Sequence, residues 1–575
     1  MTRSLFVLTT GVGALAVTAG LFGWQTDSIA RQNIKPLITE MKSASPKARA
    51  KMVEMIGEMG GSAAVQALVE ALGDDYSEVR REAADALGKM GDAAAVPGLI
   101  KALDDPDSEV RREVADALGQ IGGAAAVPGL IKALDDPDRE VRREVADALG
   151  QIGGAAAVPG LIKALKDSDS EVRREAADSL GMLGDNAATP ALIEALKDDS
   201  SEVRREAADS LGMLGDERAA AALTNALRDD SQEVRREAAD SLGQLGSDEA
   251  MSGLLEALRD ESSEVRREAA DALGKYKDDR VVKALIGALK DPSGEVRREA
   301  ADGLGQSGNP EAAPALITAL KDPSGEVRRE AADALGQMHS SQAVSALIEA
   351  LKDPSNDVRR EAIDSLREIK DARAVPALIE ALKDPSNDVR REAARALGQL
   401  GSSDSIQPLL KSLTDRSTDV RRESASALGL IGVASGEVVS ALTNIVKDDR
   451  SDVRRQGALS LGWLGKPAAS AVPALKQLLN DKDQVVVFNA AYALVMMEQA
   501  EPVRVIPVLT KGLELSEWNQ DIPYRAAKAL GRLGASAKGA IPALSGVSRS
   551  SSEWIRDACQ EAIKAINAVE PLGAR

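Results

Sequence analysis

The chain has 575 residues and a formal net charge of −19, because 91 acidic side chains outnumber 72 basic ones. This balance argues against the broad basic surface of a nucleic-acid-binding protein. One histidine excludes a metal site built from several histidines, and one cysteine excludes an internal disulfide.

The first 26 residues differ in composition from the rest of the chain. Arg3 precedes an apolar run over residues 5–24 that holds no charge, and Val17-Thr18-Ala19 is typical of a cleavage site. The segment predicts a signal peptide, or a membrane anchor if residues 5–24 are retained. We therefore expect an extracytoplasmic protein, periplasmic or secreted. The alternative is an apolar helix that packs on the first repeat.

One motif recurs along the remaining chain. Val-Arg-Arg begins at twelve positions spaced 31 residues apart, from Val79 to Val420, and a thirteenth copy begins at Val453. Looser copies bring the number of units to 17. A fixed period of a few tens of residues predicts one long solenoid in place of several globular domains.

The unit from Asp92 to Gly122 shows the pattern of a helical hairpin. Asp92 is placed to cap the first helix, Asp107 to cap the second, and Gly122 to end it. The two apolar stripes consist of Val96, Leu99, Ile100 and Leu103, and of Val110, Val114, Ala117, Leu118 and Ile121. A lone hairpin leaves these stripes exposed, whereas stacked hairpins bury them.

The charges of the second helix sort by direction. Arg112 and Asp116 point away from the stripe and form an i, i+4 pair, while Arg111 and Glu113 leave on opposite flanks. We expect the arginine flank of one unit to meet the glutamate flank of the next. The face is then largely self-neutralised.

An Asp at the turn, then Val-Arg, then Ala and Leu at helical spacing, resembles the HEAT repeat. The wording of residues 78–88 resembles its short-repeat, phycobilisome-lyase-like subclass, and the match covers roughly residues 28–568. The resemblance implies an all-α, right-handed superhelical solenoid of about 17 two-helix repeats whose second helices line the concave face. It also implies a structural ladder between repeats, formed by Asp105, Arg111, Asp136, Arg142, Asp167 and Arg173.

The sequence predicts four parts. Residues 1–26 are the signal peptide or anchor, 27–62 an N-terminal capping repeat, 63–432 regular repeats, and 433–575 divergent C-terminal repeats with a cap. Terminal repeats of a solenoid are atypical because they close its core.

The C-terminal repeats depart from the pattern. The outward column of the second helix is Asp in ten successive units, from Asp85 to Asp364, and then changes, while aromatic residues gather near the C-terminus. These aromatics either cap the core or bind a partner. The surface interpretation is favoured for Phe488, Tyr492 and Tyr524, because the same positions of the second helix hold charged residues in the other repeats. The predicted partner-binding residues are Arg455, Trp463, Phe488, Tyr492, Tyr524, Lys528 and Trp554.

No catalytic residue, metal site or cofactor is predicted. His339 lacks a surrounding nucleophile motif. Cys559 is expected to be a small buried residue, with a reactive thiol beside Arg556 as the alternative. The turn 104–107 carries three Asp but lacks the glycine and distal glutamate of an EF-hand, so weak divalent binding is only an alternative to capping.

We therefore predict a non-catalytic scaffold outside the cytoplasm that binds a protein or peptide along its concave face. It is expected to be a monomer without a nucleic-acid partner, touching a membrane only through residues 5–24 if these stay uncleaved. The alternatives are a bilin lyase or chromophore chaperone, as the subclass name implies, and a nucleic-acid-binding HEAT protein. The apparent targeting segment argues against the first, and the acidic charge against the second.

Overall fold

The computed structural model describes residues 34, 36–41, 43–514, 521–547 and 553–568. These residues form α-helices joined by turns and short 3-10 helices, and no strand occurs among them. The predicted all-α solenoid of two-helix repeats is confirmed. Residues 1–26, on which the signal-peptide and anchor predictions rest, lie outside the described residues.

The chain divides into two compact units between Ala284 and Leu285, and helix α17 (Asp279–Ala288) spans the division. The division falls inside the regular repeats predicted for residues 63–432. The predicted boundaries at 26, 62 and 432 stay a prediction.

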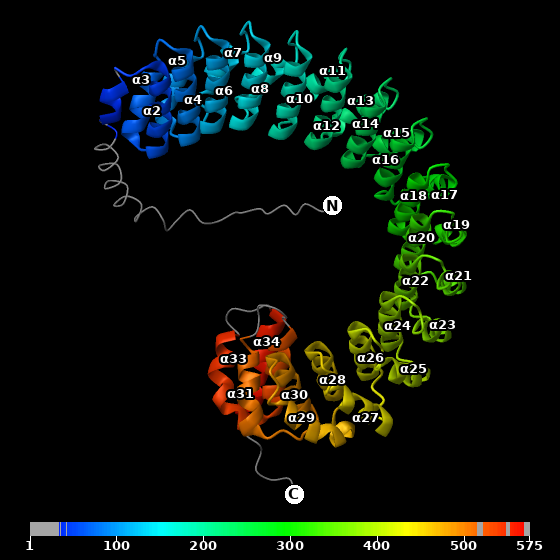
Figure 1. The fold of residues 1–575 in the computed structure, drawn as a ribbon. Coiled ribbons are helices and arrows are strands. Elements are labelled where there is room, and N and C mark those ends of the chain that lie inside the picture. Colours follow the sequence, from blue (N-terminus) through cyan, green and yellow to red (C-terminus); the bar gives the residue numbers. More distant parts are fainter. Residues whose placement is uncertain (1–33, 35, 42, 515–520, 548–552, 569–575) are drawn as a thin grey trace. The chain divides into compact units, whose positions relative to one another are not determined.

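In the first unit, first and second helices form two separate rows (Figure 1). The second helices are α2 (Pro46–Met59), α4 (Ser77–Met90), α6 (Ser108–Ile121), α8 (Arg139–Ile152), α10 (Ser170–Leu183), α12 (Ser201–Leu214), α14 (Gln232–Leu245) and α16 (Ser263–Gly274). The first helices are α3 (Ser62–Ala71), α5 (Val96–Ala102), α7 (Val127–Ala133), α9 (Val158–Ala164), α11 (Thr189–Ala195), α13 (Ala220–Ala226) and α15 (Asp248–Ala257).

The second unit repeats this plan. Its second helices are α18 (Gly294–Ser307), α20 (Gly325–Gln337), α22 (Asn356–Ile369), α24 (Asn387–Leu400), α26 (Thr418–Ile431), α28 (Ser451–Leu464), α30 (Gln484–Met496), α32 (Asp521–Arg532) and α34 (Glu553–Asn567). Its first helices are α19 (Ala313–Ala319), α21 (Val344–Ala350), α23 (Val375–Ala381), α25 (Ile406–Ser412), α27 (Gly436–Ile445), α29 (Val472–Leu478), α31 (Pro502–Gly512) and α33 (Ile541–Val547).

The repeat built from α5 and α6 forms as its sequence predicts. The Asp92 carboxylate accepts a hydrogen bond from the Ala94 N–H, which caps a short 3-10 turn before α5. The Asp107 carboxylate accepts from the N–H groups of Glu109 and Val110 and so caps α6. These bonds satisfy donors that a helix start otherwise leaves unpaired.

Successive second helices approach closely because small residues face each other. A Cβ added to Gly119 of α6 would lie 3.0 Å from the Cα of Ala148 in α8. The same seam in later repeats holds a buried serine: the Ser210 hydroxyl donates to the Ala177 carbonyl oxygen at 2.8 Å. A larger side chain on either helix would force the pair apart.

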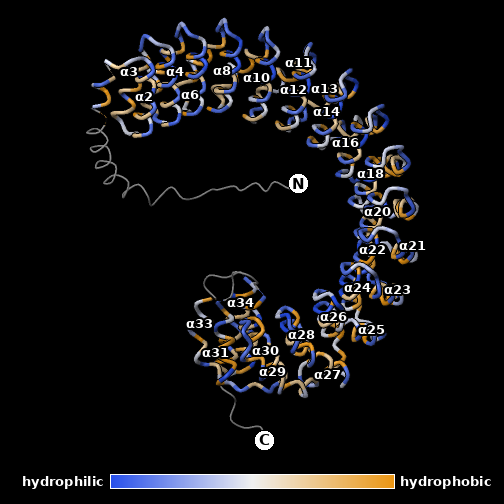
Figure 2. The backbone as a smooth tube through the Cα atoms, viewed as in Figure 1, coloured by the Kyte–Doolittle hydropathy of each residue, from blue (hydrophilic) through white to orange (hydrophobic). Residues whose placement is uncertain are grey.

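The core lies between the two rows. Leu99 of α5 and Val110, Val114 and Leu118 of α6 are fully buried. Figure 2 shows the hydrophilic residues gathered at the turns and the hydrophobic ones along the helices of each repeat. Each repeat therefore buries its apolar stripes only by stacking on its neighbours.

The predicted pair between Arg112 and Asp116 is wrong. The Arg112 guanidinium lies 3.0 Å from Glu109, and the Asp116 carboxylate accepts a hydrogen bond from Gln120. The i, i+3 acid lies on the same helical face as Arg112, so both spacings were available to it.

Candidate partner-binding surface

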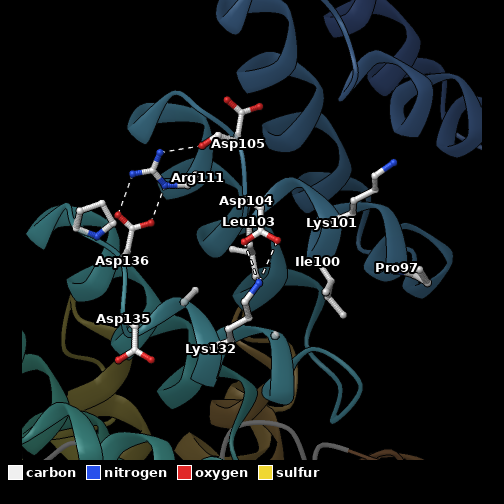
Figure 3. A pocket seen from close by; sticks show the side chains of 13 residues that line it. Pro97, Ile100, Lys101, Leu103, Asp104, Asp105, Arg111, Lys132, Asp135 and Asp136 are labelled. Carbon is white, nitrogen blue, oxygen red and sulfur yellow. Dashed lines mark hydrogen bonds and ion pairs between the residues drawn. The ribbon is translucent and has the colours of Figure 1, made fainter.

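The first arginine of each motif links two repeats. Arg111 donates through Nε and Nη2 to the two carboxylate oxygens of Asp136 at 2.6 and 2.8 Å, and through Nη1 to the Asp105 carbonyl oxygen at 2.8 Å. Figure 3 shows Arg111 between these two aspartates. Bidentate guanidinium–carboxylate pairs are among the stronger hydrogen-bonded contacts in proteins. The helical directions predicted that the first arginine meets a glutamate, and this prediction is wrong. The partner is the turn aspartate of the next repeat, as in the ladder that the resemblance to HEAT repeats implied.

The same contact recurs along both units, and the residues predicted for the ladder take part in it. In the first unit the pairs are Arg49–Asp74, Arg80–Asp105, Arg111–Asp136, Arg142–Asp167, Arg173–Asp198, Arg204–Asp229 and Arg235–Asp260. In the second they are Arg297–Asp322, Arg328–Asp353, Arg359–Asp384, Arg390–Asp415, Arg421–Asp448 and Arg454–Asp481.

The pKa values of the ladder reflect this pairing. Burial by itself raises the pKa of Asp167, but hydrogen bonds from Arg142 and from the Asp169 N–H outweigh it and leave the pKa below its usual value. The bond to Asp136 raises the pKa of Arg111. Both groups are therefore charged at neutral pH, and the ladder is ionic.

The acidic turns use their carboxylates within the protein. Asp105 accepts from Arg80, Asp107 caps α6, and Asp104 lies 3.0 Å from the Lys132 ammonium group. A cleft of about 650 Å³ lies beside this turn, lined by Pro97, Ile100 and the paired charges in Figure 3. The ladder, the helix cap and the lysine pair together account for the three aspartates, so no carboxylate of this turn needs a calcium ion as its partner.

A second charge row runs along the exposed face of the second helices. In α10 the Arg174 guanidinium lies 3.3 Å from Glu175 of its own helix and 3.8 Å from Glu206 of α12. Burial raises the pKa of these glutamates, and neighbouring aspartates add to it. At Glu361 of α22, burial and the charges of Asp333 and Asp364 raise the pKa to about 7.

Phe488 of α30 is not on the surface. The ring is 1% exposed, and a Cβ added to Gly512 of α31 would lie 2.6 Å from it. The expectation that Phe488 stands on an exposed column is wrong, because Gly512 leaves a space into which the ring turns. Phe488 is a core residue between α30 and the following repeat.

Tyr492, one turn further along α30, is half-buried beside an arginine. The Arg525 guanidinium carbon lies 5.6 Å from the Tyr492 ring centre and 5.5 Å from that of Phe488. Arg525 also donates to Asn489 Oδ1 at 3.0 Å and lies 2.8 Å from Asp521. Its burial lowers the pKa of the Arg525 guanidinium. The gap between α30 and α32 is thus filled by a cation stacked on two rings.

The other predicted residues lie on the exposed face. Trp463 is 40% and Trp554 41% exposed, and the Tyr524 and Trp554 ring centres are 5.1 Å apart. Two predicted cations are paired within the protein: Lys528 lies 2.6 Å from Glu561, and Arg455 is ion-paired with Asp483. The structure thus brings Tyr524, Lys528 and Trp554 together on α32 and α34.

Sequence reasoning missed Leu430, Arg525 and Arg532. Leu430 is 52% exposed and occupies in α26 the same helical position as Trp463 in α28. Arg525 stands in the column that holds glutamate from Glu82 to Glu423. Arg532 lies in the same column as Leu430 and Trp463, so comparing every column of the second helix across repeats, beyond the acidic one, would have found all three.

The surroundings of His339 and Cys559 indicate structural roles for both residues. His339 is exposed just after α20 with a φ of 48°, the left-handed conformation that glycine adopts at other helix ends. Cys559 is fully buried in α34, and burial raises the pKa of its thiol. A raised pKa disfavours the nucleophilic thiolate, which supports the interpretation of Cys559 as a core residue.

One known protein family matches the repeats in succession along the chain. The family profile described as HEAT repeats matches residues 34–105, 96–169, 158–238, 221–301, 282–361, 344–429, 408–495 and 439–519. The chain belongs to the HEAT-repeat family. No curated protein sequence matches this HEAT-repeat protein.

Solved structures share its fold at low sequence identity. Importin β superposes with a TM-score of 0.65 at 14% identity, covering 93% of this chain and 88% of the importin chain. Kap95p, in a structure titled for its binding to RanGDP, gives a TM-score of 0.52 at 14% identity, with 96% and 91% covered. Kap121p gives 0.53 at 13% identity, with 94% and 78% covered.

The extracytoplasmic location predicted from residues 1–26 is contradicted by these comparisons. The structural neighbours are importins and karyopherins, one of them titled for nuclear import complex assembly, and they give no support to an exported protein. Among the described helices, none has the length and apolar character that crossing a bilayer requires.

Proposed function

We propose that this HEAT-repeat protein is a non-catalytic scaffold that binds protein or peptide partners along the face formed by its second helices. One observation carries the proposal. The Arg–Asp ladder continues to Arg454–Asp481, whereas the exposed columns of the second helix already change from Arg395 onward. Residues needed for stacking are thus kept while exposed ones diverge, as expected where a partner selects the surface.

Two further points support the proposal. Elongated repeat surfaces are typical binding platforms, and the structural neighbour Kap95p binds Ran according to its title. We propose a monomer, because each repeat needs only its own neighbours for stacking. We also propose that the repeats belong to the short, phycobilisome-lyase-like subclass, on the basis of the 31-residue period and the wording of residues 78–88.

The test uses the full chain as bait in its native organism, followed by calorimetry of each captured protein with the purified chain. A scaffold is expected to bind at least one captured protein directly and with a defined stoichiometry. Failure of every captured protein to bind in the purified system would contradict the proposal.

The same purified chain tests the two alternatives. Covalent pigmentation of an acceptor after co-expression with a bilin would favour a lyase. Salt-dependent binding to DNA would favour a nucleic-acid partner. Either result would replace the scaffold proposal.

A further inference from the structure

The second helices of the C-terminal repeats expose a row of large apolar side chains on one face. This apolar stripe consists of Leu430, Trp463, Tyr492, Tyr524 and Trp554, one from each of α26, α28, α30, α32 and α34. Isolated apolar residues are common on surfaces, but a contiguous row typically marks an interaction site.

The stripe is continuous across repeats. A Cβ added to Gly429 of α26 would lie 2.8 Å from the Trp463 ring, and one added to Gly462 of α28 would lie 3.3 Å from the Tyr492 ring. The Tyr524 and Trp554 rings are in contact. Trp463 and Tyr492 therefore lean over the helix of the preceding repeat, Tyr524 touches Trp554, and Leu430, Trp463 and Trp554 keep large exposed areas.

The charge beside the stripe differs from that of the rest of the protein. The regular repeat 108–138 carries three basic and six acidic residues, whereas residues 485–568 carry nine basic and eight acidic ones. Arg532 is exposed on the stripe-bearing face of α32, and Lys528 is exposed on the same helix while it pairs with Glu561 of α34. Acidic groups of a partner would meet cations here and carboxylates on the regular repeats.

The spacing of the stripe suits an extended chain. Packed helices lie about 8–10 Å apart, and an extended peptide advances about 3.3 Å per residue. Apolar side chains at about every third position of a peptide therefore match Leu430, Trp463, Tyr492 and the Tyr524–Trp554 pair, whose ring centres lie only 5.1 Å apart and which form one anchor.

We propose that the apolar stripe docks an extended peptide segment that carries aromatic or aliphatic side chains about every third residue, with Asp or Glu between them. This inference deepens the proposed scaffold function and rests on it. The partner's apolar side chains lie against Trp463, Tyr492 and Tyr524, and its carboxylates lie beside Lys528 and Arg532.

The test measures fluorescence anisotropy of a labelled peptide with Phe at every third position and Asp or Glu elsewhere, titrated with the full chain. We expect saturable binding. Replacing the acids of the peptide by Lys, or its Phe by Ser, is expected to weaken binding about tenfold or more. Equal binding of the Lys peptide, or no binding of the acidic one, would overturn the proposal.

Protein variants locate the site. Trp463→Ala and Trp554→Ala are each expected to weaken binding of the acidic peptide about tenfold and to lower Tm far less than the loss of a buried ring would, because both side chains lie at the surface, 40% and 41% exposed. Met213→Ala, which removes an exposed apolar side chain from α12, is the matched control and is expected to bind normally. Unchanged binding by both Trp variants would place the site elsewhere.

Two outcomes separate this inference from the scaffold function. If a partner identified by capture binds both Trp variants as well as the unaltered chain, the scaffold stands and the stripe is not its site. If the chain dimerises through Trp463, seen as a concentration-dependent mass that Trp463→Ala abolishes, the occupant is a second copy, and the peptide proposal is wrong.

Discussion

The regular repeats and the C-terminal repeats use the same second helix in different ways. From α4 to α14 and from α18 to α22, the exposed face is a row of arginines and carboxylates that pair with each other. From α26 onward that face carries Leu430, Trp463 and Tyr492. The glutamates of these pairs are largely buried and their charges face the arginines of the same row, whereas exposed aromatic side chains can anchor a partner.

The buried side of the same helix changes later along the chain. The ladder persists to Arg454, after which Val487 and Pro523 stand where the first arginine stood. Phe488 and Arg525 then fill the space between repeats. A solenoid can therefore alter its exposed face while its stacking contacts stay the same, because the two use different sides of one helix.

The largest expected effect is the loss of stability when the buried Phe488 ring of the C-terminal repeats is removed. Phe488→Ala removes a buried ring and is expected to lower the free energy of unfolding by about 3–5 kcal/mol. Urea unfolding followed by tryptophan fluorescence and circular dichroism measures it, with Phe488→Leu as a control expected to cost less than about 1.5 kcal/mol. An unchanged midpoint for Phe488→Ala would contradict the core assignment.

The ladder of the regular repeats is tested at two adjacent arginines. Arg359→Ala leaves the Asp384 carboxylate and the Asp353 carbonyl oxygen without their donor and is expected to cost about 3 kcal/mol. Arg360→Ala removes a more exposed ion pair with Asp357 and is expected to cost less than about 1 kcal/mol. Hydrogen exchange of α22 and α24 reports both, and equal protection in the two variants would deny the ladder its structural role.

The raised pKa of Glu361 predicts that replacing this side chain changes stability in a pH-dependent way. Because the folded pKa of Glu361 is raised to about 7, its contribution favours folding at low pH and is lost as pH rises from the unfolded pKa toward 7. Glu361→Gln is therefore expected to stabilise the protein by about 1 kcal/mol above pH 7 and to have no effect near pH 4.

Glu392, in the same column, provides the comparison. Arg391 and Arg395 lie 2.8 and 3.7 Å from its carboxylate, and no aspartate stands at the outward position of its helix. Glu392→Gln is expected to destabilise at pH 7, because it removes the partner of two arginines. Melting temperatures of both variants measured across pH check these expectations. If both variants raise, or both lower, the melting temperature at pH 7, the proposed difference between the surroundings of Glu361 and Glu392 is contradicted.

The smallest expected effect is that of removing a whole regular repeat. Deleting residues 139–169 removes Arg142 and Asp167 together, so the Arg111–Asp136 and Arg173–Asp198 pairs both keep their partners. Folding is expected to persist with little change in Tm. Deleting residues 466–498 removes Asp481 and Phe488 together and is expected to disrupt the C-terminal repeats. Circular dichroism melts distinguish the two deletions.

The sequence by itself determined the helices and their stacking. The 31-residue period, the cap at Asp107 and the apolar stripe of Val110, Val114 and Leu118 are local signals, and local hydrogen bonding and burial decide them. The helical pattern did not determine which side chains meet between repeats: the family resemblance implied the ladder, and the tertiary structure decided the individual contacts. Arg111 reaches Asp136 and not a glutamate, and Phe488 turns inward because Gly512 leaves room for its ring. A helical register gives the direction of a side chain on its own helix, but the space beside it is set by the next one.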